Sequence, residues 1–389
     1  MQPTDPPSDD RLFTAGFFVM CGFTFAVFFS VFELVPTAAF RIRDLGGGPV
    51  ASGLFTGCLT FASAVSAPIT GAYADRIGRR KTLVVSSTAV CVLTLGYAAT
   101  TSYIVMLALV IIHGLFWSGL MSASGAYLTG LVPERRRAEG IAYWGLTTVL
   151  ATAVAPPAAF WLFDRGGWLW ICLSCGALNL TMAGLSLLLT ESHMPPDLAH
   201  IRGPVIESRV LWLAGTLFLC TFGYGAITTF SALYADALHV TPKSIFLTAL
   251  GATMLVTRPF SGRVADRFGY RRVLLPCLVF MTLGLALLSA STTRVGFVWA
   301  AFVFGVGFGT AYPVFVAYVM RDIDARRRGA AFGAILAAFD TGIGSGSIAS
   351  GWLIQRMGFP MAFGMAAALS ATSLPYFLVA DRRWRRATR

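Results

Sequence analysis

The chain carries one loop signature twice, at positions 191 residues apart. The first copy, residues 71–81, reads GAYADRIGRRK, and the second copy, residues 262–272, reads GRVADRFGYRR. The same offset carries Gly114 onto Gly305 and the arginine run 135–137 onto 326–328. Three separate landmarks that share one offset indicate that the chain is a duplication of a unit about half its length.

The composition places both copies in a membrane. Only 12% of the 389 residues are charged, 56% are hydrophobic, and the mean hydropathy is +0.71, whereas soluble domains carry about 25% charged residues. A helix needs about 20 apolar residues to cross the bilayer. The sequence contains twelve such runs, at about 12–36, 50–72, 82–100, 103–131, 138–163, 168–190, 209–235, 243–262, 273–291, 295–320, 329–354 and 360–380.

These runs and the duplication together predict an all-α membrane protein of twelve transmembrane helices, arranged as two pseudo-symmetric six-helix bundles. We expect an N-terminal bundle over residues 1–190, an inter-bundle loop over 191–208 and a C-terminal bundle over 209–389. Parallel repeats of this kind, related by an axis along the membrane normal, occur in secondary transporters.

The net charge of +12 follows from the topology. Of the 30 Lys and Arg residues, 23 lie in even-numbered connections and the termini, 6 in odd-numbered connections, and Arg258 inside a span. Because cytoplasmic loops carry the excess of Lys and Arg, we expect both termini in the cytoplasm and no nucleic-acid partner. Arg258 is expected to extend its side chain to the inner interface. The preference for Arg over Lys suggests a GC-rich bacterium, and we therefore expect the protein in a bacterial inner membrane.

Each signature has the residue types of a loop that closes the cytoplasmic face. Glycine permits close helix approach, the aspartate lies where the helix emerges, and the second glycine allows a sharp turn. Asp75 and Asp266 are therefore expected to cap a helix or to pair with the arginine runs and hold this face shut; the alternative for the basic residues is anchoring at lipid headgroups. The predicted gate residues are Gly71, Asp75, Arg76, Gly78, Arg79, Gly262, Asp266, Arg267, Gly269 and Arg271.

The doubled motif within twelve spans resembles the major facilitator superfamily. The resemblance implies one central cavity, lined by spans 1, 4, 7 and 10, and alternating access by rocking. Two positions depart from the family pattern: Val110 stands where an arginine is frequent, and residues 151–159 carry alanines where drug–proton antiporters have glycines. Residues 133–143 resemble bacterial efflux-type members.

Asp340 is the strongest candidate for a functional charge inside a span. It lies eleven residues after Gly329, about 16 Å along the helix, which is mid-membrane. A charge there costs at least about 2.5–3.5 kcal/mol. We expect a carboxylate that binds and releases a proton or pairs with a substrate cation; a structural hydrogen bond is the alternative.

His113 lies at a similar depth in span four. Because it belongs to the other half, a contact with Asp340 is expected in one access state only, which would couple protonation to rocking. The alternative is a neutral histidine hydrogen-bonded to a neighbouring helix.

Glu33 ends a stripe in span one that also contains Phe18, Gly22, Phe25 and Phe29 at helical spacing. If the stripe faces the cavity, it suits an amphipathic cation; if it faces lipid, Glu33 reaches the surface. The residues expected to line the cavity are Phe25, Phe29, Trp117, Tyr224, Thr228 and Tyr312.

These observations favour a proton-coupled secondary transporter that exports a small organic or amphipathic solute by antiport. A facilitator or a proton-symport importer on the same fold is the alternative, and an intramembrane enzyme or receptor is remote. The chain has two lysines, Lys81 and Lys243, and neither follows a glycine, so the sequence lacks a Walker A motif. We therefore expect that ATP does not drive transport directly. We expect a monomer whose partners are the substrate, protons and the bilayer, with no cofactor and no metal.

Overall fold

The computed structural model describes residues 12–191, 208–323 and 327–387. Its regular secondary structure there is helical. The elements are α1 (Ala15–Asp44), α2 (Pro49–Ile77), α3 (Arg79–Ala99), α4 (Tyr103–Leu131), the 3-10 turn η2 (Glu134–Arg136), α5 (Arg137–Leu187), α7 (Ser208–Ala237), α8 (Ile245–Phe268), α9 (Tyr270–Ala290), α10 (Arg294–Arg321) and α11 (Arg328–Ala387).

Glycines separate the helices at both signature loops. Gly78 (φ 111°) lies between α2 and α3, and Gly269 (φ 89°) lies between α8 and α9. Both values fall in the left-handed region that glycine adopts without a steric penalty. The sharp turns predicted at these two positions are present.

Helices α5 and α11 each hold two membrane crossings. A straight helix of 51 residues would be about 76 Å long, far more than the about 30 Å of a hydrocarbon core. Non-helical glycines divide them, Gly167 (φ 62°) in α5 and Gly358 (φ 82°) in α11. These glycines again lie 191 positions apart. With both divisions counted, the ten α-helices of the described residues supply twelve crossings, and the predicted fold class is confirmed.

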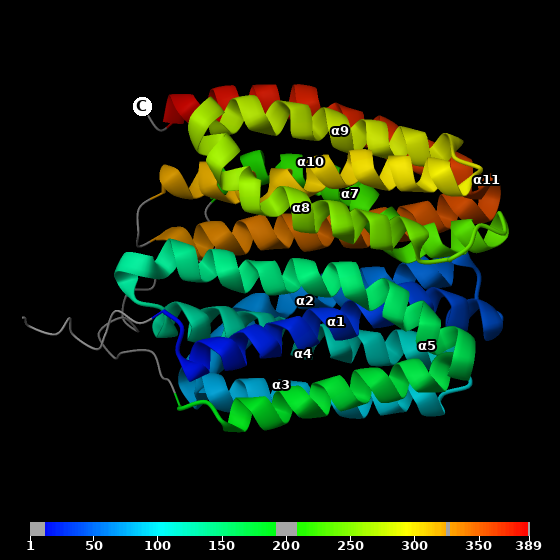
Figure 1. The fold of residues 1–389 in the computed structure, drawn as a ribbon, viewed down its shortest axis with the longest axis horizontal. Coiled ribbons are helices and arrows are strands. Elements are labelled where there is room, and N and C mark those ends of the chain that lie inside the picture. The colour runs from blue at the N-terminus through cyan, green and yellow to red at the C-terminus, as the bar shows by residue number, and fades with distance from the viewer. Residues whose placement is uncertain (1–11, 192–207, 324–326, 388–389) are drawn as a thin grey trace, which may run out of the picture.

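The helices form two groups that follow each other in the chain. Figure 1 shows α1–α5 in the lower part of the molecule and α7–α11 in the upper part. Within the groups, α1 packs on α5, α10 on α9 and α11 on α7. Most of the expected inter-bundle loop, residues 192–207, lies outside the described residues, so the domain boundaries stay predictions.

The two groups repeat the same internal contacts. A Cβ added to Gly114 of α4 would collide with the carbonyl oxygen of Leu59 in α2, and one added to Gly305 of α10 would lie 3.3 Å from the side chain of Leu250 in α8. Both the glycines and their partners are related by the offset of 191. The duplication read from the sequence is therefore also a duplication of packing.

Candidate functional site

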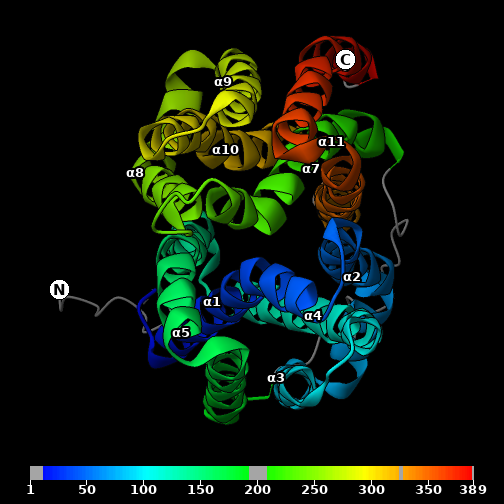
Figure 2. The same ribbon diagram turned by 90° about the vertical axis from the view of Figure 1, so that its right-hand side faces the viewer.

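The surface between the two groups is the candidate site. Four helix pairs meet across it, α2 with α11, α5 with α8, α1 with α7 and α2 with α7. We call the end of the molecule where α2 and α8 finish the even end, and the end where α1 and α7 finish the odd end. The even end lies at the left of Figure 1, and Figure 2 looks onto the odd end.

The odd half of this interface is tightly closed. A Cβ on Gly53 of α2 would collide with the carbonyl oxygen of Ser347 in α11, and one on Gly251 of α8 would collide with the backbone of Ala153 in α5. Backbone approach this close requires glycine at the contact.

Hydroxyl groups add direct bonds between the bundles at this level. Thr229 of α7 donates to Thr56 of α2 at 2.9 Å, and its hydroxyl lies 2.7 Å from that of Ser347. All three side chains are buried. A buried hydroxyl without a partner is costly, so this cluster favours the closed arrangement of the odd half.

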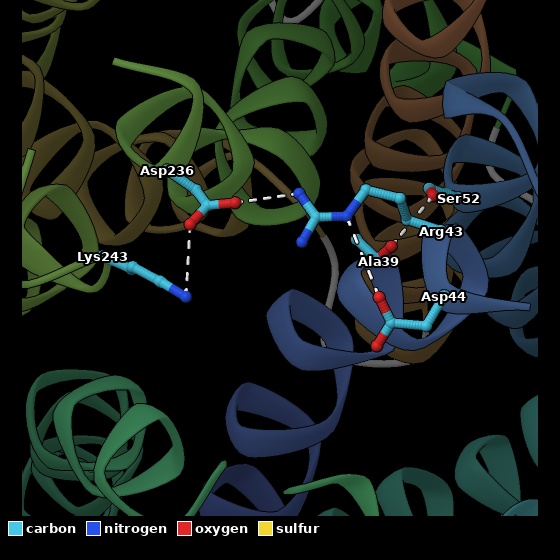
Figure 3. Close-up of polar contacts among 6 residues, drawn as sticks. All are labelled: Ala39, Arg43, Asp44, Ser52, Asp236 and Lys243. Carbon is cyan, nitrogen blue, oxygen red and sulfur yellow. Dashed lines mark hydrogen bonds and ion pairs between the residues drawn. The ribbon is translucent and has the colours of Figure 1, made fainter. Parts of the chain in front are cut away.

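An ion cluster lies at the odd end itself (Figure 3). Asp236 of α7 accepts from Arg43 of α1 at 2.8 Å and pairs with Lys243 at 3.2 Å. Both cations also lie over the ring of Phe40, at 5.0 Å and 5.2 Å from its centroid. Arg43 is half exposed, so the pair contributes about 0–1 kcal/mol. The cluster joins the two bundles across the odd end.

The even half of the same interface is open. Gly71 lies two heptads after Gly57 on the same face of α2, Gly333 lies three turns before Gly344 on α11, and Gly262 lies three turns after Gly251 on α8. A Cβ on Gly57, Gly344 or Gly251 would press on atoms of the other bundle, whereas a Cβ on Gly71, Gly333 or Gly262 would meet nothing within 4 Å. The helices therefore separate toward the even end.

Asp340 lies where the closed part meets the open part. Its carboxylate accepts a hydrogen bond of 3.3 Å from Ser63, the middle residue of α2. Among the described residues, this is the inter-bundle hydrogen bond nearest to the even end. Asp340 is half-buried and twelve residues into α11, about 18 Å from the helix start, which agrees with the predicted mid-membrane depth.

Glu33 and His113 lie inside the N-terminal bundle. Glu33 is fully buried, and its Oε2 accepts from Ser174 at 3.1 Å and from Cys175 at 3.8 Å, both in the second crossing of α5. Its Oε1 has no hydrogen-bond partner among the described residues. Glu33 therefore lies neither in the opening between the two bundles nor at the lipid surface, which were the two positions expected for it.

His113 is bonded within its own half. Its Nδ1 lies 3.1 Å from the hydroxyl of Tyr97 in α3, and the two rings are stacked. The expected contact with Asp340 is not formed in this state, and the arrangement corresponds to the alternative of a histidine bonded to a neighbouring helix.

The six residues expected to line the cavity divide into two groups. Phe25, Phe29, Trp117 and Tyr312 are half-buried; Phe25 contacts Phe29, Trp117 contacts Phe28, and Tyr312 contacts Phe339, the neighbour of Asp340. Tyr224 and Thr228 are buried within the C-terminal bundle, where Tyr224 stacks on Phe308 at 4.2 Å.

Arg258 is a candidate that the sequence analysis assigned to the membrane interface. It lies ten residues before Phe268, the end of α8, which is about 15 Å along the helix. Its guanidinium lies 5.9 Å from the ring centroid of Tyr312 in α10, so it points across the C-terminal bundle. Among the described residues no carboxylate pairs with it. The sequence signal for this position is the separation of ten residues between Arg258 and the end of the helix.

The signature aspartates are bonded within their own loops. Asp75 lies 4.0 Å from Arg79, and Asp266 accepts from the hydroxyl of Tyr270 at 2.9 Å. Arg136 of the first arginine run bonds Glu139 instead. The expected bonds between these aspartates and the arginine runs are not seen among the described residues. Arg326 and the side chains of Arg137 and Arg328 lie outside the described part of the chain, so this pairing stays a prediction.

Comparison with known proteins shows the family. The profile of the Major Facilitator Superfamily matches residues 12–257 and 240–389. The chain is 26% identical over 342 residues to the uncharacterized MFS-type transporter YhhS of Escherichia coli K12, covering 83% of this chain and 82% of the relative. It is 25% identical over 376 residues to an uncharacterized MFS-type transporter of Burkholderia pseudomallei, covering 93% and 91%.

Solved structures share the fold. The crystal structure of the nucleoside transporter NupG superposes with a TM-score of 0.74 at 15% identity, covering 95% of this chain and 99% of that one. The D-xylose-proton symporter gives 0.76 at 13% identity, covering 93% and 96%. Since the superfamily profile spans both bundles, the protein belongs to the Major Facilitator Superfamily and is a multi-pass membrane transporter, not an enzyme.

Proposed function

We propose that the protein exports a small organic or amphipathic solute in exchange for protons, by alternating access between its two bundles. The observation that carries this proposal is the position of Asp340. Its carboxylate bonds Ser63 across the bundles at the boundary between the closed and the open half. A group at this boundary exchanges protons with one side of the membrane at a time, as coupling requires.

Exchange follows from the chemistry of a single carboxylate. A proton and a cationic group of a solute compete for the same charge, so loading one releases the other. Export also agrees with the resemblance of residues 133–143 to efflux-type members. A facilitator or a proton-symport importer is the alternative. Antiport, symport and facilitated transport differ in how the movement of solute responds to a pH gradient.

The signature loops are proposed to close the even end in the opposite state. Asp75 and Asp266 are bonded only locally among the described residues, so both are available for new partners when the loops approach. With cytoplasmic termini, as the distribution of Lys and Arg indicates, the state described here is open to the cytoplasm of a bacterial cell. Glu33 and His113 are proposed as secondary proton sites, since both are titratable and buried in the bilayer.

The test is transport in proteoliposomes with an imposed pH gradient, using dye, sugar, amino-acid and metal-chelate panels. Asp340→Asn is expected to abolish pH-driven transport at unchanged protein yield. The control is Asp164→Asn, an exposed carboxylate at the odd end, which is expected to behave as wild type. Antiport requires opposite movement of solute and protons; parallel movement indicates symport, and no response indicates a facilitator. Undiminished transport by Asp340→Asn would refute the proposal.

A further inference from the structure

A groove of about 600 Å³ lies on the outer side of the C-terminal bundle, between α7 and the second crossing of α11. Figure 2 shows this last part of α11, in red, at the periphery of the molecule. The groove is mainly apolar. Its lining residues are Gly215, Phe218, Leu219, Thr372, Pro375, Tyr376 and Val379.

A specific contact shapes the even end of the groove. The hydroxyl of Tyr376 donates to the carbonyl oxygen of Trp212 at 2.8 Å. This bond crosses directly over Gly215, where a Cβ would collide with the Tyr376 hydroxyl. Gly215 thus holds the two helices at the spacing that the groove needs.

The N-terminal bundle does not repeat this construction. The positions 191 residues before Gly215 and Tyr376 are Thr24 and Leu185. Thr24 accepts a hydrogen bond of 2.7 Å from Trp144, and Leu185 lies 4.0 Å from the position of a Cβ on Gly22. Since the duplication repeats the packing elsewhere, the contact between Gly215 and Tyr376 is a feature of one half and not a consequence of the fold.

The groove leads to positive charge. Thr372, Tyr376, Val379, Arg383 and Arg386 follow one another at intervals of four and three residues, so they share one face of α11.

Within the described part of the chain, no carboxylate pairs with three of the arginines at this end. Arg382, Arg383 and Arg386 are exposed, and Arg383 lies 5.4 Å over the ring of Trp212. Arg385, by contrast, is paired with Asp381 at 2.7 Å. The positions 191 residues earlier, 191–195, contain no Arg or Lys.

We infer that this groove binds one anionic phospholipid, with an acyl chain along the apolar lining and the headgroup phosphate at Arg383, flanked by Arg382 and Arg386. In a bilayer the groove borders hydrocarbon, so an acyl chain fills it without desolvating any polar group. The guanidinium fork matches the geometry of a phosphate. A zwitterionic lipid offers the same chain but carries no net charge for the three arginines.

The inference is tested by native mass spectrometry of the full-length protein, released from detergent after titration with equal amounts of phosphatidylglycerol and phosphatidylcholine of the same chains. The wild type is expected to retain one phosphatidylglycerol. Replacing Arg382, Arg383 and Arg386 by Gln is expected to weaken its retention by about fivefold per arginine. Val379→Trp is expected to fill the groove and abolish retention with the charges intact.

The matched control is Arg356→Gln. Arg356 lies 4.7 Å over Trp352 at the odd end, which gives an Arg–Trp pair at the opposite end of the molecule from the three arginines, and its replacement is expected to leave retention unchanged. Thermal unfolding of each variant confirms that it is folded. Equal retention of the two lipids, full retention by the triple variant or by Val379→Trp, or no adduct on the wild type would each overturn the inference. None of these readouts depends on transport.

Discussion

The hydroxyl of Tyr318 donates a hydrogen bond to the fully buried carboxylate of Asp381, which ties α10 to the last turns of α11. Arg271 and Arg385 approach the same carboxylate at 3.1 Å and 2.7 Å. The N-terminal bundle repeats the tyrosine but not the charge. Tyr127, 191 residues earlier, donates to the backbone oxygen of Thr190 at 3.1 Å.

This difference between the halves predicts different costs of mutation. Asp381→Asn is expected to lower the free energy of unfolding by about 1–3 kcal/mol, the cost of a disrupted buried hydrogen-bonded group. Arg271 and Arg385 are 41% and 45% exposed, so water solvates both guanidinium groups once the carboxylate is replaced. The larger cost of leaving a buried charge without a partner is therefore not expected. Thr190→Ala is the matched control, because a backbone acceptor survives the change. Equal thermal shifts of the two variants would contradict the assignment.

The bond between Ser63 and Asp340 predicts a change in the pH profile of transport. Ser63→Ala removes a hydrogen bond to this carboxylate worth about 0.5–1.5 kcal/mol. Transport is expected to persist, with its pH profile displaced by about one unit or less. Ser66→Ala is the control, because that hydroxyl donates within its own helix to Ala62 at 2.6 Å. A pH profile of transport identical to that of the wild type would show that Ser63 takes no part in proton coupling.

The ion cluster at the odd end predicts a shift in the access equilibrium. Asp236→Asn removes a pair worth about 0–1 kcal/mol, so labelling of a Thr56→Cys reporter by an impermeant maleimide from the odd side is expected to rise by up to about fivefold. Asp44→Asn is the control, because its contact with Arg43 is 4.0 Å long. The role of the cluster is rejected if the two variants label alike.

Two glycines of α2 that face the other bundle, Gly53 and Gly71, predict opposite effects when each is replaced by leucine. Gly53→Leu introduces a side chain where the bundles touch, so it is expected to open the odd end and close the even end. Gly71→Leu introduces one where nothing lies within 4 Å, so the present state is expected to tolerate it and the opposite state to exclude it. Maleimide labelling from each side of the membrane measures both effects. If labelling changes in the same direction in the two variants, Gly53 and Gly71 do not lie in opposite halves of the interface.

Much of the fold was predictable from the sequence because its signals are local or repeated. Apolar runs set the number of crossings, the offset of 191 residues set the repeat, and Gly78 and Gly269 set the loops after α2 and α8. Each signal depends on the preference of a short segment for the bilayer or for a backbone conformation.

The orientation of the polar residues was not predictable in the same way. Each helix has faces toward its own bundle, toward the other bundle and toward lipid, and all three faces are largely apolar in a membrane. The periodicity that identifies the core face of a soluble helix is therefore weak. Glu33 was expected at the cavity or at lipid and lies inside a bundle, and Arg258 was expected at the interface and points toward Tyr312.

The sequence by itself determined that this chain crosses the membrane twelve times as a duplicated unit, because burial of apolar segments and tight glycine turns act within short stretches of chain. Only the tertiary structure decided which polar groups meet, as Ser63 and Asp340 do, and which half of the interface is closed. Those contacts join residues hundreds of positions apart, and they depend on how two bundles pack in one of their states.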